Sequence, residues 1–271
     1  MVGFPNAKIN LGLYITSKRS DGYHELVSCF YPVAWEEALE IIPASSFSFS
    51  SSGLTIPGES GTNLVVKAYE LMKKNHNIPT SAIHLHKAIP MGAGLGGGSA
   101  DAAVTLLLLN QLYNLSLSKD ELMRLCAQLG SDCTFFIHNT PCMATSRGEV
   151  LAPVTLSLKG YQILLVHPGI HISTQQAYAG VKPQPLNFNV EELLKEKPSS
   201  WKNKLSNQFE EHLFVQFPEV AQIKEKLYSL GADYASMSGS GSAVYGIFKA
   251  EAKIEEAEWP EHYKWKVVSC K

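Results

Sequence analysis

A glycine-rich run in the first half of the sequence has the composition of a phosphate-binding loop. It consists of Pro90, Met91, Gly92, Ala93, Gly94, Leu95, Gly96, Gly97, Gly98, Ser99 and Ala100. Glycine permits positive φ angles and a close approach of the backbone to an anion. A strand pattern precedes the run and a helix pattern follows it, so the unpaired amides at the start of that helix would face the same anion. This context favours a cradle for a triphosphate such as that of ATP over a flexible surface loop.

The same run satisfies the pattern G-x-G-x-x-G through Gly92, Gly94 and Gly97. That pattern occurs in dinucleotide-binding units and in the loop that covers ATP in protein kinases. A dinucleotide unit needs a second parallel strand with an acidic residue about 20 positions on, whereas here a second helix pattern follows. The sequence has no G-x-x-x-x-G-K-[ST] and no H-R-D or D-F-G triplet. The run therefore indicates a kinase that is neither of the P-loop nor of the protein-kinase class.

A second glycine cluster lies near the end of the chain, before a strand pattern at Val244–Phe248. Its residues are Met237, Ser238, Gly239, Ser240, Gly241, Ser242 and Ala243. Two interpretations stay open: a simple turn, or a second set of backbone amides that clamps a phosphate opposite the first.

Phosphoryl transfer to a hydroxyl also needs a group to manage the proton and a cation to stabilise negative charge. Asp132 and Lys8 are the candidates for these roles. Asp132 follows Gly130 at the end of a predicted helix, where it could instead be the N-cap of the next helix. Lys8 stands at the start of a predicted strand, where it could be a solvated edge residue. Their spacing in the sequence does not bring them together.

His84 and His86 would lie on one face of a predicted strand. Zinc sites need at least three protein ligands, and no third ligand is evident nearby. We therefore expect surface residues of a strand.

The composition excludes several classes of protein. Of the 271 residues, 45% are hydrophobic and 18% charged, as in folded globular proteins, and the formal net charge is −2. Without a positive patch, nucleic-acid binding is not expected, and an anionic ligand must be held by local amides and cations. The five cysteines show no C-x-x-C spacing and fit a reducing compartment. Met1–Lys8 lacks the features of a signal peptide and the apolar run at Ala102–Leu109 is too short to span a membrane, so we expect a cytoplasmic protein.

Hydrophobic periodicity predicts the elements that would position these residues. Strand patterns cover residues 9–15, 26–35, 39–42, 47–51, 83–85, 162–166 and 244–248, and the first of them suggest an antiparallel start. Helix patterns cover residues 63–74 and 99–112, and a capping box at Ser118 opens a helix that Gly130 would close. Several helical stretches follow up to Leu230. The pattern restarts near Lys159 and Gly160, which predicts an N-terminal domain of residues 1–159 and a C-terminal domain of residues 160–271 with a shared cleft.

Three motifs in this order resemble those of the GHMP kinase superfamily. They are Pro5-Asn6-Ala7-Lys8-Ile9-Asn10-Leu11, the run Pro90–Ala100, and Met237-Ser238-Gly239-Ser240-Gly241, and they span nearly the whole chain. With Asp21-Gly22-Tyr23-His24, the first motif is similar to the branch whose acceptor is a methylerythritol that carries a cytidine diphosphate, in the non-mevalonate route to isoprenoids. The resemblance implies a two-domain α+β fold: an N-terminal domain of the ribosomal-protein-like α/β type and a ferredoxin-like C-terminal domain. ATP and substrate would meet between them, with Mg²⁺ on the triphosphate.

The resemblance also implies roles for individual residues. Asp132 would be the general base toward the 2-hydroxyl, Lys8 would keep that carboxylate ionised and stabilise charge, and Asn10 would place the erythritol part. Because the transition state is loose, orientation of the hydroxyl can matter more than basicity. The remaining positions implied for the acceptor are Tyr23, His24, Thr174 and Tyr178, with the cytosine between aromatic rings, and those implied for ATP are Asn63 and the run Pro90–Ala100. Ser99 is the candidate magnesium ligand.

Two departures from the family pattern accompany this resemblance. Ser131-Asp132-Cys133-Thr134 replaces the more usual Ala-Asp-Val-Pro, and Ser242-Ala243 replaces Ala-Cys, but the aspartate is kept.

Two other functions remain: a related kinase with mevalonate or homoserine as its acceptor, and an ATP-binding module without turnover. The D-G-Y-H motif argues against the first, since those acceptors carry no cytosine, and the presence of both Lys8 and Asp132 argues against the second.

Overall fold

The computed structural model describes residues 1–58, 60–254 and 257–270. The chain forms two compact units that do not follow the order of the sequence. Unit 1 comprises Met1–Ala7, Trp35–Met91 and Gly96–Thr140, and unit 2 comprises Lys8–Ala34, Gly92–Leu95 and Pro141–Lys271. The glycine-rich run is therefore divided between the units. The sequence boundary at residues 159 and 160 stays a prediction.

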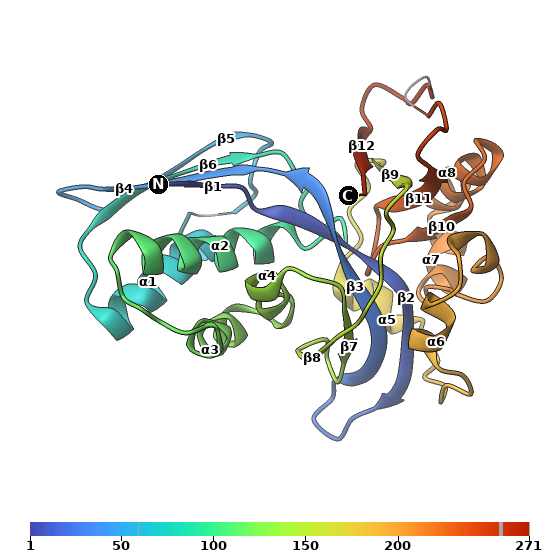
Figure 1. Cartoon of the computed structure of the whole chain (residues 1–271), viewed down its shortest axis with the longest axis horizontal. Coiled ribbons are helices and arrows are strands. Elements are labelled where there is room, and N and C mark those ends of the chain that lie inside the picture. Colours follow the sequence, from blue (N-terminus) through green and yellow to red (C-terminus); the bar gives the residue numbers. More distant parts are fainter. Residues whose placement is uncertain (59, 255–256, 271) are drawn as a thin grey trace. The chain divides into compact units, whose positions relative to one another are not determined.

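Unit 1 contains a four-stranded sheet in the order β1-β4-β6-β5 and the helices that pack against it (Figure 1). Its strands are β1 (Val2–Gly3), β4 (Ala38–Pro43), β5 (Ser48–Gly53) and β6 (Ser81–Lys87). Its helices are η1 (Ser60–Thr62), α1 (Leu64–His76), α2 (Gly97–Leu112), α3 (Lys119–Leu129), η2 (Ser131–Thr134) and α4 (Phe135–His138). Helix α2 packs against β4 and β1 and is itself covered by α1, α3 and α4. This arrangement buries α2 on most sides.

The alternation of apolar and polar residues in β6 follows from the two faces of the strand. Ile83 and Leu85 are buried, and they pair with Ile41 and Leu39 of β4 in an antiparallel register. The intervening His84 and His86 face outward and hydrogen-bond to serines of the parallel strand β5, with Ser50 and Ser52 at 2.9 Å from His84 and Ser52 at 3.0 Å from His86. The two histidines are thus surface residues of a strand, as expected.

Unit 2 contains two four-stranded sheets, in the orders β2-β3-β7-β8 and β10-β11-β9-β12. Their strands are β2 (Asn6–Lys18), β3 (His24–Glu36), β7 (Cys142–Thr145), β8 (Val150–Pro153), β9 (Tyr161–His167), β10 (Tyr234–Met237), β11 (Val244–Lys249) and β12 (Lys264–Ser269). Strand β2 begins in unit 1, and strand β3 ends there. The helices are α5 (Thr174–Ala179), α6 (Val190–Leu194), η3 (Pro198–Ser200), α7 (Glu210–Gln216) and α8 (Pro218–Ser229). Helix α8 packs on β10 and β11, where Ile223 and Leu227 join Val244 and Phe248 in one hydrophobic core.

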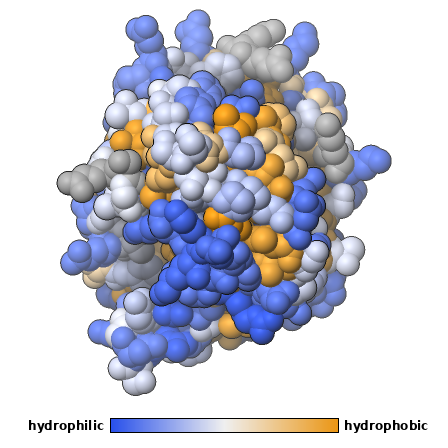
Figure 2. Space-filling view, turned by 90° about the vertical axis from the view of Figure 1, so that its left-hand side faces the viewer, coloured by the Kyte–Doolittle hydropathy of each residue, from blue (hydrophilic) through white to orange (hydrophobic). Residues whose placement is uncertain are grey.

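The surface shows no single hydrophobic face in the view of Figure 2, where hydrophobic residues lie among hydrophilic ones. Exposed hydrophobic side chains of unit 1 include Val2, Phe4 and Ile42. Within the described ranges, none of the helices is both long and apolar enough to cross a membrane.

The capping box predicted at Ser118 is confirmed. The Ser118 hydroxyl accepts a hydrogen bond from the Glu121 amide at 3.3 Å, and the Glu121 carboxylate accepts one from the Ser118 amide at 2.8 Å. We expect Ser118→Ala to lower the free energy of unfolding by about 1 kcal/mol in urea titrations, because amides at the start of α3 lose their partner. The control Ser17→Ala, at an exposed position of β2, should change it by less than about 0.5 kcal/mol. Equal losses in both variants would contradict the capping role.

Candidate active site

The two glycine-rich segments pack directly on each other in unit 2. The Ser238 hydroxyl donates to the Gly94 carbonyl at 2.9 Å, and the Ala243 amide donates to the Ala93 carbonyl at 3.1 Å. A Cβ atom at Gly94 would lie 1.9 Å from the Ser238 carbonyl oxygen, and Gly94 has a φ of +76°. Only glycine fits this contact. The second cluster is therefore more than a simple turn, since it fixes the first.

Strand β2 brings Lys8 and Asn10 to the same place. The Lys8 amide donates to the Leu95 carbonyl at 2.9 Å, and the Asn10 amide donates to the Ser238 hydroxyl at 3.3 Å. The Tyr245 hydroxyl donates to the Asn10 carbonyl at 2.7 Å. Lys8, Asn10 and both glycine segments thus form one hydrogen-bonded framework.

The side chain of Lys8 is a buried cation, with 3% of the residue exposed. Its Nζ donates to Asn10 Oδ1 at 2.5 Å and lies 4.4 Å from the centre of the Phe30 ring. Asn10 Nδ2 in turn donates to the Ser28 hydroxyl at 2.9 Å. Amide and aromatic partners help to orient this ammonium group. The alternative of a solvated edge residue is wrong.

Two buried polar residues that sequence reasoning missed support the second glycine cluster. Asn207 Nδ2 donates to the carbonyls of Met237 and Gly239, at 2.9 and 2.8 Å. The carboxylate of Glu210 accepts from the Met237 amide at 2.7 Å and from Lys224 Nζ at 2.5 Å. Their only signal in the sequence is a polar stretch before a helix pattern. These contacts hold the cluster in one conformation.

The residues expected to recognise cytosine are partly brought together. The rings of His24 and Tyr178 stack with centroids 5.0 Å apart and planes 29° apart, and Phe209 packs edge-on against Tyr178. Burial, and then the charge of Lys18, lower the pKa of His24, so its imidazole is neutral at pH 7. A neutral imidazole offers both a donor and an acceptor to a base.

Two further residues implied for the acceptor are Tyr23, which directly precedes β3, and Thr174, which lies in α5 with Tyr178. Tyr23 is 56% exposed, and the guanidinium of Arg147 lies 4.9 Å from its ring centre. Arg147 was not predicted. Thr174 is the first residue of α5, after an N-cap at Ser173 whose capping box includes Gln176. The Thr174 side chain is exposed.

In unit 1 the start of α2 has the geometry of an anion site. Gly96 is its N-cap, with a φ of +71°, and as a glycine it has no side chain that could cap the first amides. The residues that follow, Gly97, Gly98 and Ser99, present first-turn amides and the positive end of a 16-residue helix. Ala93 and Leu95, in the part of the run that belongs to unit 2, are buried. The run is therefore not a flexible surface loop.

Asp132 lies beside this helix start, in the 3-10 turn η2. The turn packs against α2, and the Ser99 hydroxyl interacts with the Cys133 thiol, whose pKa burial raises to about 11. The N-cap of α4 is Thr134, so the alternative role of Asp132 as that cap is wrong. The structure thus brings the predicted base close to the predicted phosphate cradle in unit 1. Its pairing with Lys8, which belongs to unit 2, stays a prediction.

Asn63 has a structural role that leaves part of its side chain for a ligand. It is the N-cap of α1, and its Oδ1 accepts from the Val65 amide at 2.8 Å. Its Nδ2 group is not used in that cap. The expected contact of Asn63 with ATP stays a prediction.

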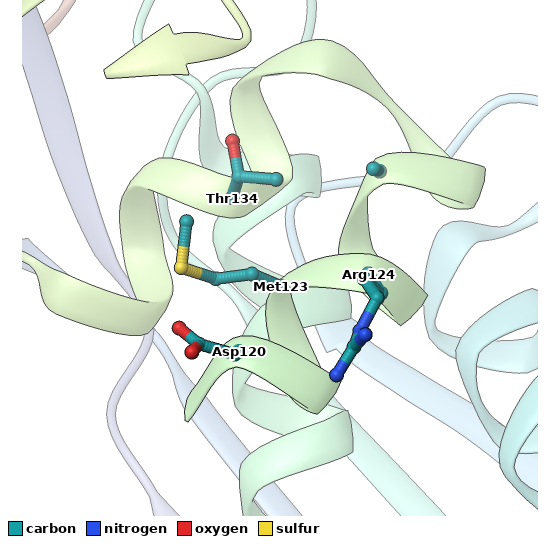
Figure 3. Close-up of a pocket in the computed structure, with 5 residues that line it drawn as sticks. Asp120, Met123, Arg124 and Thr134 are labelled. Carbon is teal, nitrogen blue, oxygen red and sulfur yellow. The ribbon is translucent and has the colours of Figure 1, made fainter. Parts of the chain in front are cut away.

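A cavity of about 400 Å³ lies beside η2 (Figure 3). Its lining comes from α3 and from the turn, through Asp120, Met123, Arg124, Ala127 and Thr134. The Met123 side chain points toward Thr134 in this view. None of the predicted site residues lines this cavity, so we do not assign a substrate to it.

Comparisons with known proteins agree with the motifs. The model of the GHMP kinases N terminal domain matches residues 63–140, and that of the GHMP kinases C terminal domain matches residues 189–264. The chain is 50% identical to a 4-diphosphocytidyl-2-C-methyl-D-erythritol kinase of Bacteroides thetaiotaomicron, over 96% of each chain. The chain belongs to the 4-diphosphocytidyl-2-C-methyl-D-erythritol kinases, within the GHMP kinases. It is therefore a small-molecule kinase, as predicted.

Further relatives support this family. A kinase of the same name from Cytophaga hutchinsonii is 49% identical over 93% of each chain. A crystal structure of a 4-(cytidine 5'-diphospho)-2C-methyl-D-erythritol kinase is similar with a TM-score of 0.81 and 30% identity, and covers 100% of this chain and 99% of that one. A mevalonate kinase of Methanococcus jannaschii shares the fold, with a TM-score of 0.69 at 15% identity, over 100% of this chain and 98% of that one. These findings confirm the predicted α+β GHMP kinase fold.

The contact between the glycine segments generates a prediction. We expect Gly94→Ala to lower kinase activity by roughly 100-fold, because the new Cβ must push the Ser238 carbonyl away and misplace the cradle. Steady-state kinetics would measure the loss. Gly160→Ala is the matched control, since Gly160 has a φ of +85° but nothing within 4 Å of its Cβ position. Similar activity losses in the two variants would mean that backbone strain, and not the contact, matters.

Proposed function

We propose that the chain transfers the terminal phosphate of ATP to the 2-hydroxyl group of 4-diphosphocytidyl-2-C-methyl-D-erythritol. The observation that carries this proposal is the family membership at 50% identity over nearly the full length, together with the motif residues at the site. The product would be the 2-phosphate, an intermediate of the non-mevalonate route to isoprenoid precursors. A cytoplasmic location fits such a soluble substrate.

Residues of unit 2 would bind the acceptor. His24 and Tyr178 form an aromatic surface on which a cytosine can stack, and Tyr23 adds an exposed ring that Arg147 holds from one side. Thr174 lies four residues before Tyr178 at the start of α5. Asn10 would contact the erythritol part from β2. The acceptor would thus be held at its base and at its reacting end.

The triphosphate would be bound by backbone amides. The first-turn amides of α2 and the fixed conformation of Gly94 suit oxygens with spread negative charge. Lys8, a buried cation in a framework that includes Leu95, would stabilise charge on the transferring phosphate. Asn63 would contact the nucleoside through the amide that its capping role leaves.

Asp132 would orient the 2-hydroxyl and accept its proton as the new bond forms. Its place in a turn packed against the start of α2 supports this role. Little proton abstraction is required early in a loose transition state, so alignment of the hydroxyl with the phosphorus atom would provide most of the rate.

Magnesium fits this site as an ion bound chiefly through the triphosphate. In the described part of the chain there is no group of three histidine, cysteine, aspartate or glutamate residues that could hold a metal. Mg²⁺ commonly takes one or two protein ligands beside substrate phosphates, so no such group is needed. Ser99, at the start of α2, is the residue that we propose as a ligand. The ion would neutralise and orient the phosphates.

The identity of the acceptor is tested by replacing it with other alcohols. We expect ADP release with 4-diphosphocytidyl-2-C-methyl-D-erythritol and little or none with mevalonate or homoserine, in a coupled assay with Mg-ATP. Equal rates with an acceptor that lacks cytidine would show that the aromatic residues of β3 and α5 do not select the substrate. A lack of ADP release with every acceptor, while ATP still binds, would support a non-catalytic module.

The catalytic roles are tested by substitution. Lys8→Ala and Asp132→Ala should each lower turnover by roughly 100- to 1000-fold or more, while calorimetry shows that ATP still binds, because each removes a group needed mainly in the transition state. Asp120→Asn is a control for Asp132, since Asp120 lies on the neighbouring helix α3 and lines the separate cavity. Normal rates in both alanine variants would remove the assignment.

The proposed stacking of cytosine on His24 leads to a separate prediction. His24→Ala should raise the KM for the acceptor by roughly 10- to 100-fold, the cost of one lost stacking partner, with a smaller change in kcat. Because the pKa of His24 is lowered below its ordinary value of 6.5, the imidazole stays neutral as pH rises above 7, and the KM for the acceptor should not change between pH 7 and 8. The exposed His262 provides the control variant His262→Ala. A KM that does not respond to His24→Ala would place the cytosine elsewhere.

A further inference from the structure

One turn of chain in unit 2, the 207–212 turn, contacts two parts of the proposed site. The Glu210 amide donates to the Asn207 carbonyl at 3.0 Å, and α7 begins at Glu210, so the backbone winds as in a helix. Residues three positions apart lie on one side of such a turn. Asn207 and Glu210 share the side that holds the second glycine cluster. Phe209 and His212 share another side, which faces α5.

His212 contacts the end of α5 through a hydrogen bond. Its Nε2 lies 3.3 Å from the Gln176 carbonyl oxygen and must be the donor, because a carbonyl can only accept. Gln176 is among the last four residues of α5, whose carbonyls have no partner inside an α-helix. The imidazole thus satisfies a carbonyl two residues before Tyr178 and fixes this end of the helix.

Gly180, which ends α5, shows how closely the imidazole packs there. A Cβ atom at this position would lie 2.5 Å from Cγ of His212, so the ring would have to move. The φ of Gly180 is −101°, a value that any residue adopts. The absence of a side chain is therefore needed for the space that the His212 ring occupies, and not for the conformation of the backbone.

Phe209 holds the ring of Tyr178 from the same side. Phe209 is 2% exposed, and its ring packs edge-on against that of Tyr178, with centroids 4.9 Å apart and planes 69° apart. Edge-to-face packing of this kind restricts the orientation of both rings. The orientation of Tyr178, which stacks on His24, thus depends on the 207–212 turn.

Gln208 attaches the same turn to the chain on either side of the acceptor residues. Its Nε2 donates to the Lys182 carbonyl, just after α5, and its Oε1 accepts from the Ile15 amide of β2, both at 2.7 Å. Strand β2 also carries Asn10, which would contact the erythritol part. The turn therefore joins the two elements of unit 2 that would hold the acceptor.

The two sides of the turn are themselves connected. Asn207 Nδ2 donates to the carbonyl of Gly239 in the second glycine cluster, at 2.8 Å, and Asn207 Oδ1 accepts from the Phe209 amide at 3.0 Å. One buried side chain thus links the glycine cluster to the residue that packs on Tyr178. A shift of the turn would move α5 relative to the cluster.

We propose, on the basis of the function proposed above, that the 207–212 turn aligns α5 with the second glycine cluster, with Phe209 and His212 as positioning residues for the acceptor. They act through the Tyr178 ring and the end of α5, without touching either substrate. Loss of either contact should weaken binding of the acceptor and leave the ATP site in place.

Steady-state kinetics with Mg-ATP and 4-diphosphocytidyl-2-C-methyl-D-erythritol test the role of His212. His212→Ala should raise the KM for the acceptor by roughly 3- to 10-fold, the effect of one lost hydrogen bond, with kcat and the KM for ATP unchanged. A variant that only loosens the fold would instead lower the folded fraction and hence kcat. His212→Gln, whose amide can donate to the same carbonyl, should restore most of the native KM. The exposed His262 of unit 2 provides the matched control His262→Ala.

A double-mutant cycle separates the packed contact from unrelated damage. Gly180→Ala should raise the KM for the acceptor by roughly tenfold, because the new Cβ displaces the imidazole. In His212→Ala no ring is left to displace, so adding Gly180→Ala should cause no further rise. Effects of independent origin would multiply in the double variant.

Each outcome either supports or overturns the positioning role. If His24→Ala raises the KM for the acceptor but His212→Ala does not, the positioning role fails and the proposed function stands. Effects of Gly180→Ala and His212→Ala that multiply also overturn it. A native chain that does not phosphorylate this acceptor overturns the proposed function, and the positioning role with it. If His212→Ala does not fold, Gly180→Ala must raise the KM for the acceptor alone and His212→Gln must not.

Discussion

The contact of Gly94 with the Ser238 carbonyl is the constraint on which the site in unit 2 depends. The carbonyl oxygen occupies the position of a side chain at residue 94, so the two glycine segments can approach only because that side chain is absent. The approach allows Ser238 to hydrogen-bond to Gly94 and to receive the amide of Asn10 from β2. Asn207 and Glu210 then fix the second segment from behind. The conformation of the two segments is thus fixed before any ligand arrives, which would lower the cost of the proposed phosphate binding.

The electrostatics of the chain explain why such local order is required. With a net charge of −2, the whole molecule does not attract an anion. Two buried lysines provide cations in different ways. Lys8 contacts an amide oxygen and an aromatic ring, whereas Lys87 pairs with Glu37, whose carboxylate also accepts from two backbone amides. In the proposed reaction Lys8 would stabilise charge on the transferring phosphate, while Lys87 is part of the fixed structure.

Much of this could be predicted from the sequence because the signals were local. The period of two in β2, the helix pattern after the glycines and the capping box at Ser118 depend on residues that are close in the chain. Lys8 was a candidate from the chemistry of phosphoryl transfer, whereas Asn10 and His24 came from resemblance to a family, which supplies long-range information that periodicity lacks. The structure added the reason for their burial and contacts.

The remaining features depend on contacts between distant residues. Lys87 lies 50 residues from Glu37 and 14 from Asp101, and Arg147 reaches Tyr23 from a separate turn. Each of these residues looks like an ordinary surface residue in the sequence. Strand register also decides burial: Lys87 follows the inward face of β6, while His86 beside it faces outward. No local pattern shows which lysine of such a strand will be buried with two acids.

The most direct test of the central claim is the position of the phosphate that the enzyme adds. The chain would be incubated with Mg-ATP and 4-diphosphocytidyl-2-C-methyl-D-erythritol, and the product examined by phosphorus NMR. A new phosphate monoester on the 2-hydroxyl, beside an intact diphosphate, is the predicted result. A phosphate on another hydroxyl, or ADP release without any new ester, would contradict the account of how Asn10 and Asp132 position the acceptor.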